Sequence, residues 1–240
     1  MSYNKKLSAA VVAAGLVLGS NAIAADWQTT NIQLLKGFEY EPNNKERTLI
    51  TVEHANGWKY GDNYLFFDIT DADTDGTDIY GEISPRLSFS KMTGKKIGYG
   101  LVKDVLLAGS VEVGKNIRRY LYGVGFDLDI PKFKFFKVNT YVRDDPNKEG
   151  QTYQVTLAWN MPLEYRNHKF LLEGFADFFG REGDSFDDSQ LIVPRFLLDV
   201  GNYWGQEKKV YAGVEWQYWH HKFGGATTES VPQLQLKWVF

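Results

Sequence analysis

The last nine residues of the chain constrain its fold most strongly. The segment 232–240 alternates between two kinds of residue, with Leu234, Leu236, Trp238 and Phe240 on one face and Gln233, Gln235 and Lys237 on the other. A period of two predicts a strand with one apolar and one polar face. An apolar face that ends on a bare aromatic is unfavourable in water, but it suits a strand that lies in lipid and closes a barrel. We therefore expect a transmembrane β-barrel.

The first 24 residues have the organisation of a secretory signal peptide. Lys5 and Lys6 precede an apolar stretch over residues 7–18, and Ala22-Ile-Ala24 fits a cleavage site. The alternative is a membrane anchor, but the apolar stretch is too short to span a bilayer easily. We expect a signal peptide over residues 1–24 and a barrel domain over residues 25–240.

The composition agrees with an exported barrel. The rest of the chain has no run of about 20 apolar residues, which argues against a transmembrane helix. Its mean hydropathy is -0.36, as for a soluble protein, but the polar lumen of a barrel has the same effect. Cysteine is absent and aromatic residues make up 15% of the chain. The net charge of -3 argues against nucleic acid as a partner, and no sequence motif indicates a cofactor.

About twelve antiparallel strands are expected, joined up and down in chain order. They cover residues 32–40, 48–54, 58–69, 79–90, 101–113, 119–129, 133–143, 151–161, 169–179, 190–200, 209–221 and 232–240. Asn56-Gly57 predicts one tight turn and Ile130–Lys132 another. An even number of strands places both termini on one side, which we expect to be the periplasm, with the longer polar loops outside the cell.

The alternation of side chains is clearest in the expected sixth strand. Tyr120, Tyr122, Val124, Phe126 and Leu128 share one face, and Gly123, Gly125, Asp127 and Asp129 share the other. A soluble β-sandwich or a lipocalin-like barrel is the alternative. It is disfavoured because such an aromatic outer face would associate in water.

Charged residues recur on the inward faces of the expected strands. By parity they include Glu82, Arg86, Asp127, Asp129, Glu173, Asp177, Arg195, Asp199 and Glu215, and Trp219 shares their orientation. We expect Glu82, Arg86, Asp127, Asp129, Glu173, Asp177, Arg195 and Trp219 to line a channel. The charges would set a local field and hydrogen-bond a solute, and Trp219 would stack a flat ring. The alternative is that these pairs only fill the barrel, although about twelve strands enclose more space than side chains easily occupy.

Two further patterns could carry chemistry. Asp71, Asp73 and Asp75, with Gly76 and Glu82, match the spacing of an EF-hand calcium loop. The flanking segments predict strands, so a solvated acidic loop is favoured over a weak calcium site. His220 and His221 would point to opposite faces of a strand, and no HExxH, GxSxG or P-loop motif occurs. An outer-membrane hydrolase with a Ser-His site is therefore a distant alternative.

Several segments resemble one family, the nucleoside-specific channel-forming outer-membrane proteins of the Tsx type, and within it the OmpK branch. The resemblance rests on Glu82–Thr93 (EISPRLSFSKMT), Gly123–Asp129 (GVGFDLD), Tyr218-Trp-His220 with Gly224-Gly225, and more weakly on Asn139-x-Tyr141 and Gly174-Phe-x-x-Phe178. It implies a monomeric twelve-stranded barrel in the outer membrane of a Gram-negative bacterium, surrounded by lipids and lipopolysaccharide. It also implies a narrow lumen that passes nucleosides, and external loops that serve as receptors for bacteriophages and some colicins.

The sequence therefore predicts a passive outer-membrane channel for small polar solutes, with nucleosides as the favoured substrate. One alternative is a surface receptor or structural barrel whose lumen is plugged and has no nucleoside selectivity. Its features would be the loops 41–47, 71–78, 144–150 and 180–188. An outer-membrane enzyme is the other alternative.

Overall fold

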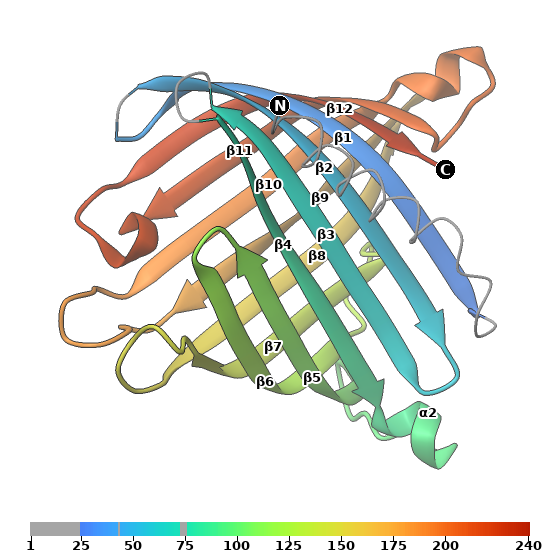
Figure 1. Cartoon of the computed structure of the whole chain (residues 1–240). Helices are drawn as coiled ribbons and strands as arrows, with labels where there is room; N and C mark the ends of the chain where they lie inside the picture. Colours follow the sequence, from blue (N-terminus) through green and yellow to red (C-terminus); the bar gives the residue numbers. More distant parts are fainter. Residues whose placement is uncertain (1–24, 43, 73–75) are drawn as a thin grey trace, which may run out of the picture.

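The computed structural model describes residues 25–42, 44–72 and 76–240, so the expected signal peptide over residues 1–24 lies outside the described residues. The described residues form twelve strands in a closed barrel (Figure 1). The strands are β1 (Trp27–Tyr40), β2 (Lys45–Trp58), β3 (Gly61–Ala72), β4 (Gly76–Ser88), β5 (Val102–Gly114), β6 (Ile117–Leu128), β7 (Phe135–Asp144), β8 (Thr152–Tyr165), β9 (His168–Phe179), β10 (Ser189–Asp199), β11 (Val210–His220) and β12 (Glu229–Val239).

Every strand pairs antiparallel with its neighbours in the sequence, and β1 pairs with β12 to close the ring. The closing register runs from Asn31 opposite Val239 to Gly37 opposite Gln233. All backbone hydrogen-bonding edges are thus satisfied between strands, which is what a lipid environment requires. The expected up-and-down barrel of about twelve strands is confirmed. No helix in the described part of the chain is long and apolar enough to cross a membrane.

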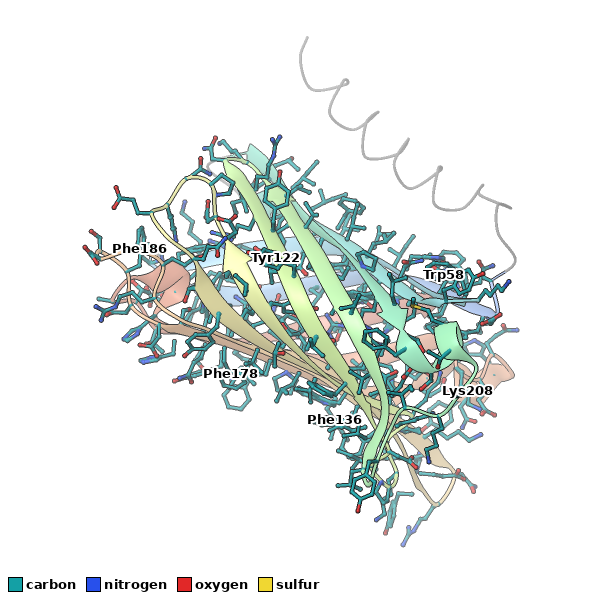
Figure 2. All side chains as sticks on the ribbon, turned by 90° about the horizontal axis from the view of Figure 1, so that it is seen from below. Trp58, Tyr122, Phe136, Phe178, Phe186 and Lys208 are labelled. Atoms are coloured by element: carbon teal, nitrogen blue, oxygen red, sulfur yellow. The ribbon has the colours of Figure 1, made fainter. Side chains whose placement is uncertain are left out.

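The barrel wall buries polar side chains and exposes apolar ones, which is the reverse of the arrangement in a soluble protein. In β12, Gln233, Gln235 and Lys237 are buried, whereas Leu234, Leu236 and Trp238 are exposed. Tyr122 and Phe178 also lie on the outside of the wall (Figure 2). Polar residues inside and apolar residues outside match a barrel in lipid, so the soluble sandwich suggested as an alternative is wrong.

The two ends of the barrel carry different connections. The start of β1 and the end of β12 lie at one end, here called the terminus end, which also carries the connections 59–60, 89–101, 129–134, 166–167 and 200–209. The opposite end, here called the loop end, is where β1 ends and β2 begins and where β3 ends and β4 begins, and it carries the connections 115–116, 145–151, 180–188 and 221–228. The acidic loop expected over residues 71–78 therefore begins and ends in strands. Asp73 and Asp75 of the calcium hypothesis lie outside the described residues.

The structure corrects two local predictions at the terminus end. Asn56 and Gly57 do not form a turn, because both lie within β2 and pair with β3. Pairing continues to Trp58 opposite Gly61, so the turn is formed by Lys59 and Tyr60. The expected fourth strand ends early, because the Ser88 hydroxyl accepts a hydrogen bond from Lys91 N at 2.9 Å. Ser88 thereby caps the short helix α2 (Phe89–Thr93).

Candidate functional site

An ion-pair network crosses the lumen about midway along the strands. This Arg195 cluster consists of Glu53, Glu173, Arg195, Glu215 and Lys237, which come from β2, β9, β10, β11 and β12. Arg195 lies 2.6 Å from Glu215, 2.9 Å from Glu53 and 3.8 Å from Glu173. Lys237 lies 2.5 Å from Glu173. Because β10 and β2 are four strands apart around the wall, the Arg195–Glu53 contact spans the interior and narrows it.

Neutral side chains complete the coordination of these carboxylates. Asn31 Nδ2 donates to Glu53 at 3.0 Å and Asn160 Nδ2 donates to Glu173 at 3.1 Å. Gln233 Nε2 donates to Glu215 at 2.9 Å. Buried charges are stable only when they are paired and hydrogen-bonded in this way. The Arg195 cluster is therefore an ordered constriction.

A second network, the Arg86 cluster, lies nearer the terminus end. Arg86 on β4 binds Asp62 on β3 with two hydrogen bonds of 3.0 and 2.7 Å, and lies 2.9 Å from Asp127 on β6. Lys137 on β7 lies 3.5 Å from Asp62. Arg86 Nη1 also donates to Asn139 Oδ1 at 3.3 Å. The fork of the guanidinium thus connects four strands, a geometry that lysine cannot supply.

The Arg86 cluster brings together three segments that carried the family resemblance. Arg86 comes from the segment 82–93, Asp127 from 123–129, and Asn139 from the Asn139-x-Tyr141 motif. Gly125 explains part of the motif, because a Cβ there would lie 2.5 Å from Asn139 Oδ1 and 3.5 Å from Arg86 Nη1. A side chain at this position would displace the amide that orients the guanidinium.

A third network, the Arg143 cluster, lies toward the loop end. Arg143 on β7 lies 2.5 Å from Glu112 on β5, and its Nε donates to Glu182 at 2.8 Å. Glu182 belongs to the 180–188 loop and also binds Lys148, in the 145–151 loop, at 2.6 Å. Partial burial alone would raise the pKa of Glu182, but the charge of Arg143 and the Lys148 hydrogen bond outweigh it and hold this pKa below its ordinary value. The two loops are thereby fastened to the wall.

Inward-facing aromatic rings form a continuous track on β3 and β4. The centroid of the Phe66 ring lies 5.9 Å from that of Tyr64 and 5.8 Å from that of Tyr80. The Tyr64 hydroxyl donates to Glu53 at 3.2 Å and the Tyr80 hydroxyl donates to Glu82 at 2.8 Å. The track therefore joins flat apolar faces to carboxylates inside the lumen.

Three inward carboxylates bind only neutral partners. Asp68 accepts from the Thr51 hydroxyl at 2.6 Å, and Asp177 accepts from the Thr156 hydroxyl at 2.5 Å. The third is Glu82, which Tyr80 holds. None of the three forms an ion pair with a basic residue in the described part of the chain. They leave the lumen with hydrogen-bond acceptors that no ion pair occupies.

The residues expected to line the lumen do not form one site. Glu82, Arg86, Asp127, Glu173, Asp177 and Arg195 do face inward, spread over the networks described above. Asp129 lies beyond the end of β6 and is exposed at the terminus end, because the strand stops at Leu128. Trp219 donates through Nε1 to Ser189 Oγ at 3.0 Å, and its ring packs against Phe223 with the centroids 4.5 Å apart. It is thus fixed at the loop end, away from the Arg195 cluster.

Several residues of the three networks were not predicted as site residues. They are Glu53, Asp62, Glu112, Lys137, Arg143 and Lys237. Strand parity was the available signal, and it had already placed Lys237 on the polar face. The aromatic track could not be assigned in this way, because Phe66 and Phe67 are adjacent and parity alone does not say which one faces inward.

The histidines lie outside these networks. His54 Nδ1 and the Thr30 hydroxyl are 2.8 Å apart, and His168 Nδ1 lies 2.6 Å from the Tyr203 hydroxyl. His220 Nδ1 lies 3.0 Å from the Thr228 hydroxyl. No group of three side chains suited to a metal ion occurs among the residues that the structure describes. The lumen as a whole offers stacking surfaces, hydrogen-bond acceptors and paired charges, which suit the passage of polar solutes.

Comparisons with known proteins agree with this architecture. Residues 24–239 match the family described as "Nucleoside-specific channel-forming protein, Tsx". Two outer membrane proteins OmpK of Vibrio parahaemolyticus are 26% identical over 136 residues and 23% identical over 171 residues. These alignments cover 54% and 64% of this chain, and 50% and 64% of the relatives, so the chain spans about half to two thirds of their length.

A solved structure has the same fold. The KdgM porin superposes with a TM-score of 0.52 over 88% of this chain and 99% of the porin, at 8% sequence identity. Such a low identity supports the barrel fold alone. The match to the family, by contrast, covers nearly the whole described barrel. The chain therefore belongs to the Tsx family of nucleoside-specific channel-forming proteins, and it is a β-barrel protein of the outer membrane of a Gram-negative bacterium.

Proposed function

We propose that the lumen passes nucleosides one at a time along the aromatic track. The observation that carries the proposal is the continuous set of rings formed by Tyr64, Phe66 and Tyr80 beside Glu53 and Glu82. A nucleobase would stack on the faces of these rings, which are partly exposed. The ribose hydroxyls and the amino groups of the base would donate hydrogen bonds to the carboxylates. A solute of this kind matches both features at once.

The narrowness of the lumen supports small neutral solutes over large or strongly charged ones. Ion pairs bridge the interior at the Arg195 and Arg86 clusters. A solute must pass between these side chains, and most of their charge is already neutralised by partners. A flat, uncharged molecule can exchange hydrogen bonds with the networks without leaving a buried charge unpaired. We therefore expect a small conductance.

The proposal also gives the barrel an orientation and external partners. The terminus end would face the periplasm and the loop end the cell exterior. The 145–151 and 180–188 loops, fastened together through Glu182, would then form an ordered surface to which a bacteriophage could attach. Lipopolysaccharide would surround this end of a monomeric barrel.

Planar bilayer recordings with Phe66→Ala and Phe67→Ala test the nucleoside proposal. Phe66 lies in the aromatic track, whereas its neighbour Phe67 faces the outside of the wall, where it lies beside Gly81. The wild-type conductance should be small and should fall on addition of adenosine or thymidine. Because stacking on an aromatic side chain contributes about 1–3 kcal/mol per base, Phe66→Ala should weaken this block by about tenfold, and Phe67→Ala should leave it unchanged.

A large wild-type conductance that does not change on addition of adenosine or thymidine would contradict the proposal. If nucleosides block the conductance of Phe66→Ala and Phe67→Ala equally, the aromatic track has no role in nucleoside binding.

A plugged receptor barrel is the second candidate, and the low exposure of inward side chains favours it. Gln33 is 0% exposed, Gln233 1% and Arg86 3%, although side chains along a wide water-filled lumen would be more exposed. A lumen closed in this way would give no conductance with any solute. Replacement of the 180–188 loop would then abolish phage adsorption without any change in nucleoside uptake, because there would be no uptake to change.

A further inference from the structure

The helix α2 (Phe89–Thr93) follows the end of β4 at the rim of the terminus end (Figure 1). Lys91 Nζ donates to the carbonyl oxygens of Trp58 at 2.7 Å and Gly61 at 3.2 Å, and it lies 3.1 Å from Asp26. On the other side, Asp104 of β5 accepts from the Ser90 hydroxyl at 2.6 Å. The helix is therefore an ordered part of the surface, held between the β2–β3 turn and β5.

An apolar pocket lies where α2 meets the outer wall. It has a volume of about 290 Å³ and is lined by Trp58, Tyr60, Leu87 and Met92. The Trp58 and Tyr60 rings meet edge to face with their centroids 5.6 Å apart, which gives the pocket a rigid side. Leu87 and Met92 are 36% and 50% exposed. Trp58 lies at the same end of the barrel as α2 (Figure 2), and Leu87 belongs to the outward face of β4, so the pocket opens toward lipid.

Exposed lysines occur near the pocket residues in the sequence, and Lys59 Nζ lies 5.0 Å from the centroid of the Tyr60 ring. Lys59 lies next to Trp58 and Tyr60, Lys95 and Lys96 directly follow α2, and Lys103 lies on β5. All four are exposed, and none of them forms an ion pair with a described residue. Exposed apolar residues accompany them along the segment after α2, and Tyr99 is 92% exposed. Interleaved lysines and aromatic residues are typical of surfaces that lie at the boundary between lipid and water.

We propose that this pocket binds an anionic glycerophospholipid. One acyl chain lies against Trp58, Leu87 and Met92, and the nearby lysines neutralise the anionic headgroup. The inference uses the membrane location of the barrel but no property of the lumen, so it is independent of the nucleoside proposal. The terminus end would face the leaflet in which such lipids occur if that end is periplasmic.

The test uses the purified full barrel in vesicles that contain brominated lipids, which quench nearby tryptophans. The contribution of Trp58 is the difference between the wild type and Trp58→Phe. Brominated phosphatidylglycerol should quench this contribution at least about threefold more efficiently than brominated phosphatidylcholine at the same mole fraction. Lys59→Gln/Lys95→Gln/Lys96→Gln/Lys103→Gln should remove the preference.

A matched set of substitutions at the same end of the barrel is the control. Lys132→Gln/Lys134→Gln/Lys209→Gln changes exposed lysines of other terminus-end connections, so the preference should persist. Circular dichroism establishes that each variant is folded. Equal quenching of the wild type by the two lipids, or an equal loss in the control, would overturn the proposal. Suppression of the preference by millimolar inorganic phosphate would indicate a site for free anions. Displacement of brominated phosphatidylglycerol by a lower concentration of lipid A would indicate a site for lipopolysaccharide. Either result would overturn the choice of a glycerophospholipid.

Discussion

Removal of the Arg195 guanidinium is the most direct perturbation of the constriction. Arg195→Met keeps most of the side-chain length but withdraws the cation from Glu53, Glu173 and Glu215. Lys237 alone then remains, 2.5 Å from Glu173 and 3.9 Å from Glu53. Glu215 loses its 2.6 Å ion pair and keeps only neutral partners. The folded barrel would thus hold carboxylates that lack a compensating charge.

The magnitude follows from the burial of these groups. The side chains of Arg195, Glu53 and Glu215 are 12%, 10% and 8% exposed. Removing one partner of a buried pair costs about 3–5 kcal/mol, and residual water in the lumen favours the lower end, about 3 kcal/mol. With a denaturant dependence of about 2–3 kcal/mol per molar urea, the unfolding midpoint should fall by about 1–1.5 M.

Urea unfolding of the reconstituted barrel, followed by tryptophan fluorescence, measures this change. Lys36→Gln is the matched control, because it breaks the ion pair with Glu46, whose two side chains are 36% and 56% exposed. An exposed pair of this kind contributes about 0–1 kcal/mol. Arg195→Met/Glu53→Gln should recover part of the loss, since it removes one uncompensated charge.

A midpoint for Arg195→Met that matches the Lys36→Gln control would refute the existence of an ordered cross-lumen network. The same variant should raise the single-channel conductance, because the side chain that bridges β10 and β2 no longer does so. An unchanged conductance together with a large loss of stability would show that Arg195 holds the barrel together without narrowing it.

Two other predictions concern charge. Asp68→Asn/Asp177→Asn should lower the preference of the channel for potassium over chloride, measured as a reversal potential in a salt gradient above neutral pH, because these carboxylates form no ion pair; an unchanged potential would show that they do not act on passing ions. Glu182 has a lowered pKa, so its stabilising contribution is complete above the ordinary glutamate pKa and is lost as the pH falls through the lowered value. Limited proteolysis should therefore cut the 180–188 loop of Glu182→Gln faster at neutral pH, and that of the wild type only in stronger acid; a wild-type loop already released above the ordinary glutamate pKa would contradict the assignment.

The strands and their two faces could be predicted because successive side chains of a barrel strand point alternately toward the lipid and toward the lumen. Tyr122 and Asp127 fall on opposite faces wherever the strand begins, so errors of a few residues at the ends leave the assignment unchanged. Asp129 shows the limit of parity, since it lies just beyond the end of β6. Asn56-Gly57 shows another limit, because strand pairing overrode a strong turn signal.

The partners inside the lumen could not be predicted, because they depend on closure and stagger of the whole ring. Arg195 meets Glu53 across a separation of 142 residues, and no local pattern encodes such a contact. The convergence of Arg86, Asp127 and Asn139 is likewise visible only after the strands are in register. The resemblance had marked their segments as related to known channels without indicating that they touch.

The seam between β1 and β12 has a consequence for assembly. Gln235 of β12 donates to Gln33 of β1 across it, and Lys237 extends from the same strand to Glu173. A chain that is still open along this seam therefore lacks both the last piece of its wall and a cation of its constriction. The wall and the constriction would therefore be completed in the same step. A partly assembled barrel would lack the complete Arg195 cluster until β12 pairs with β1.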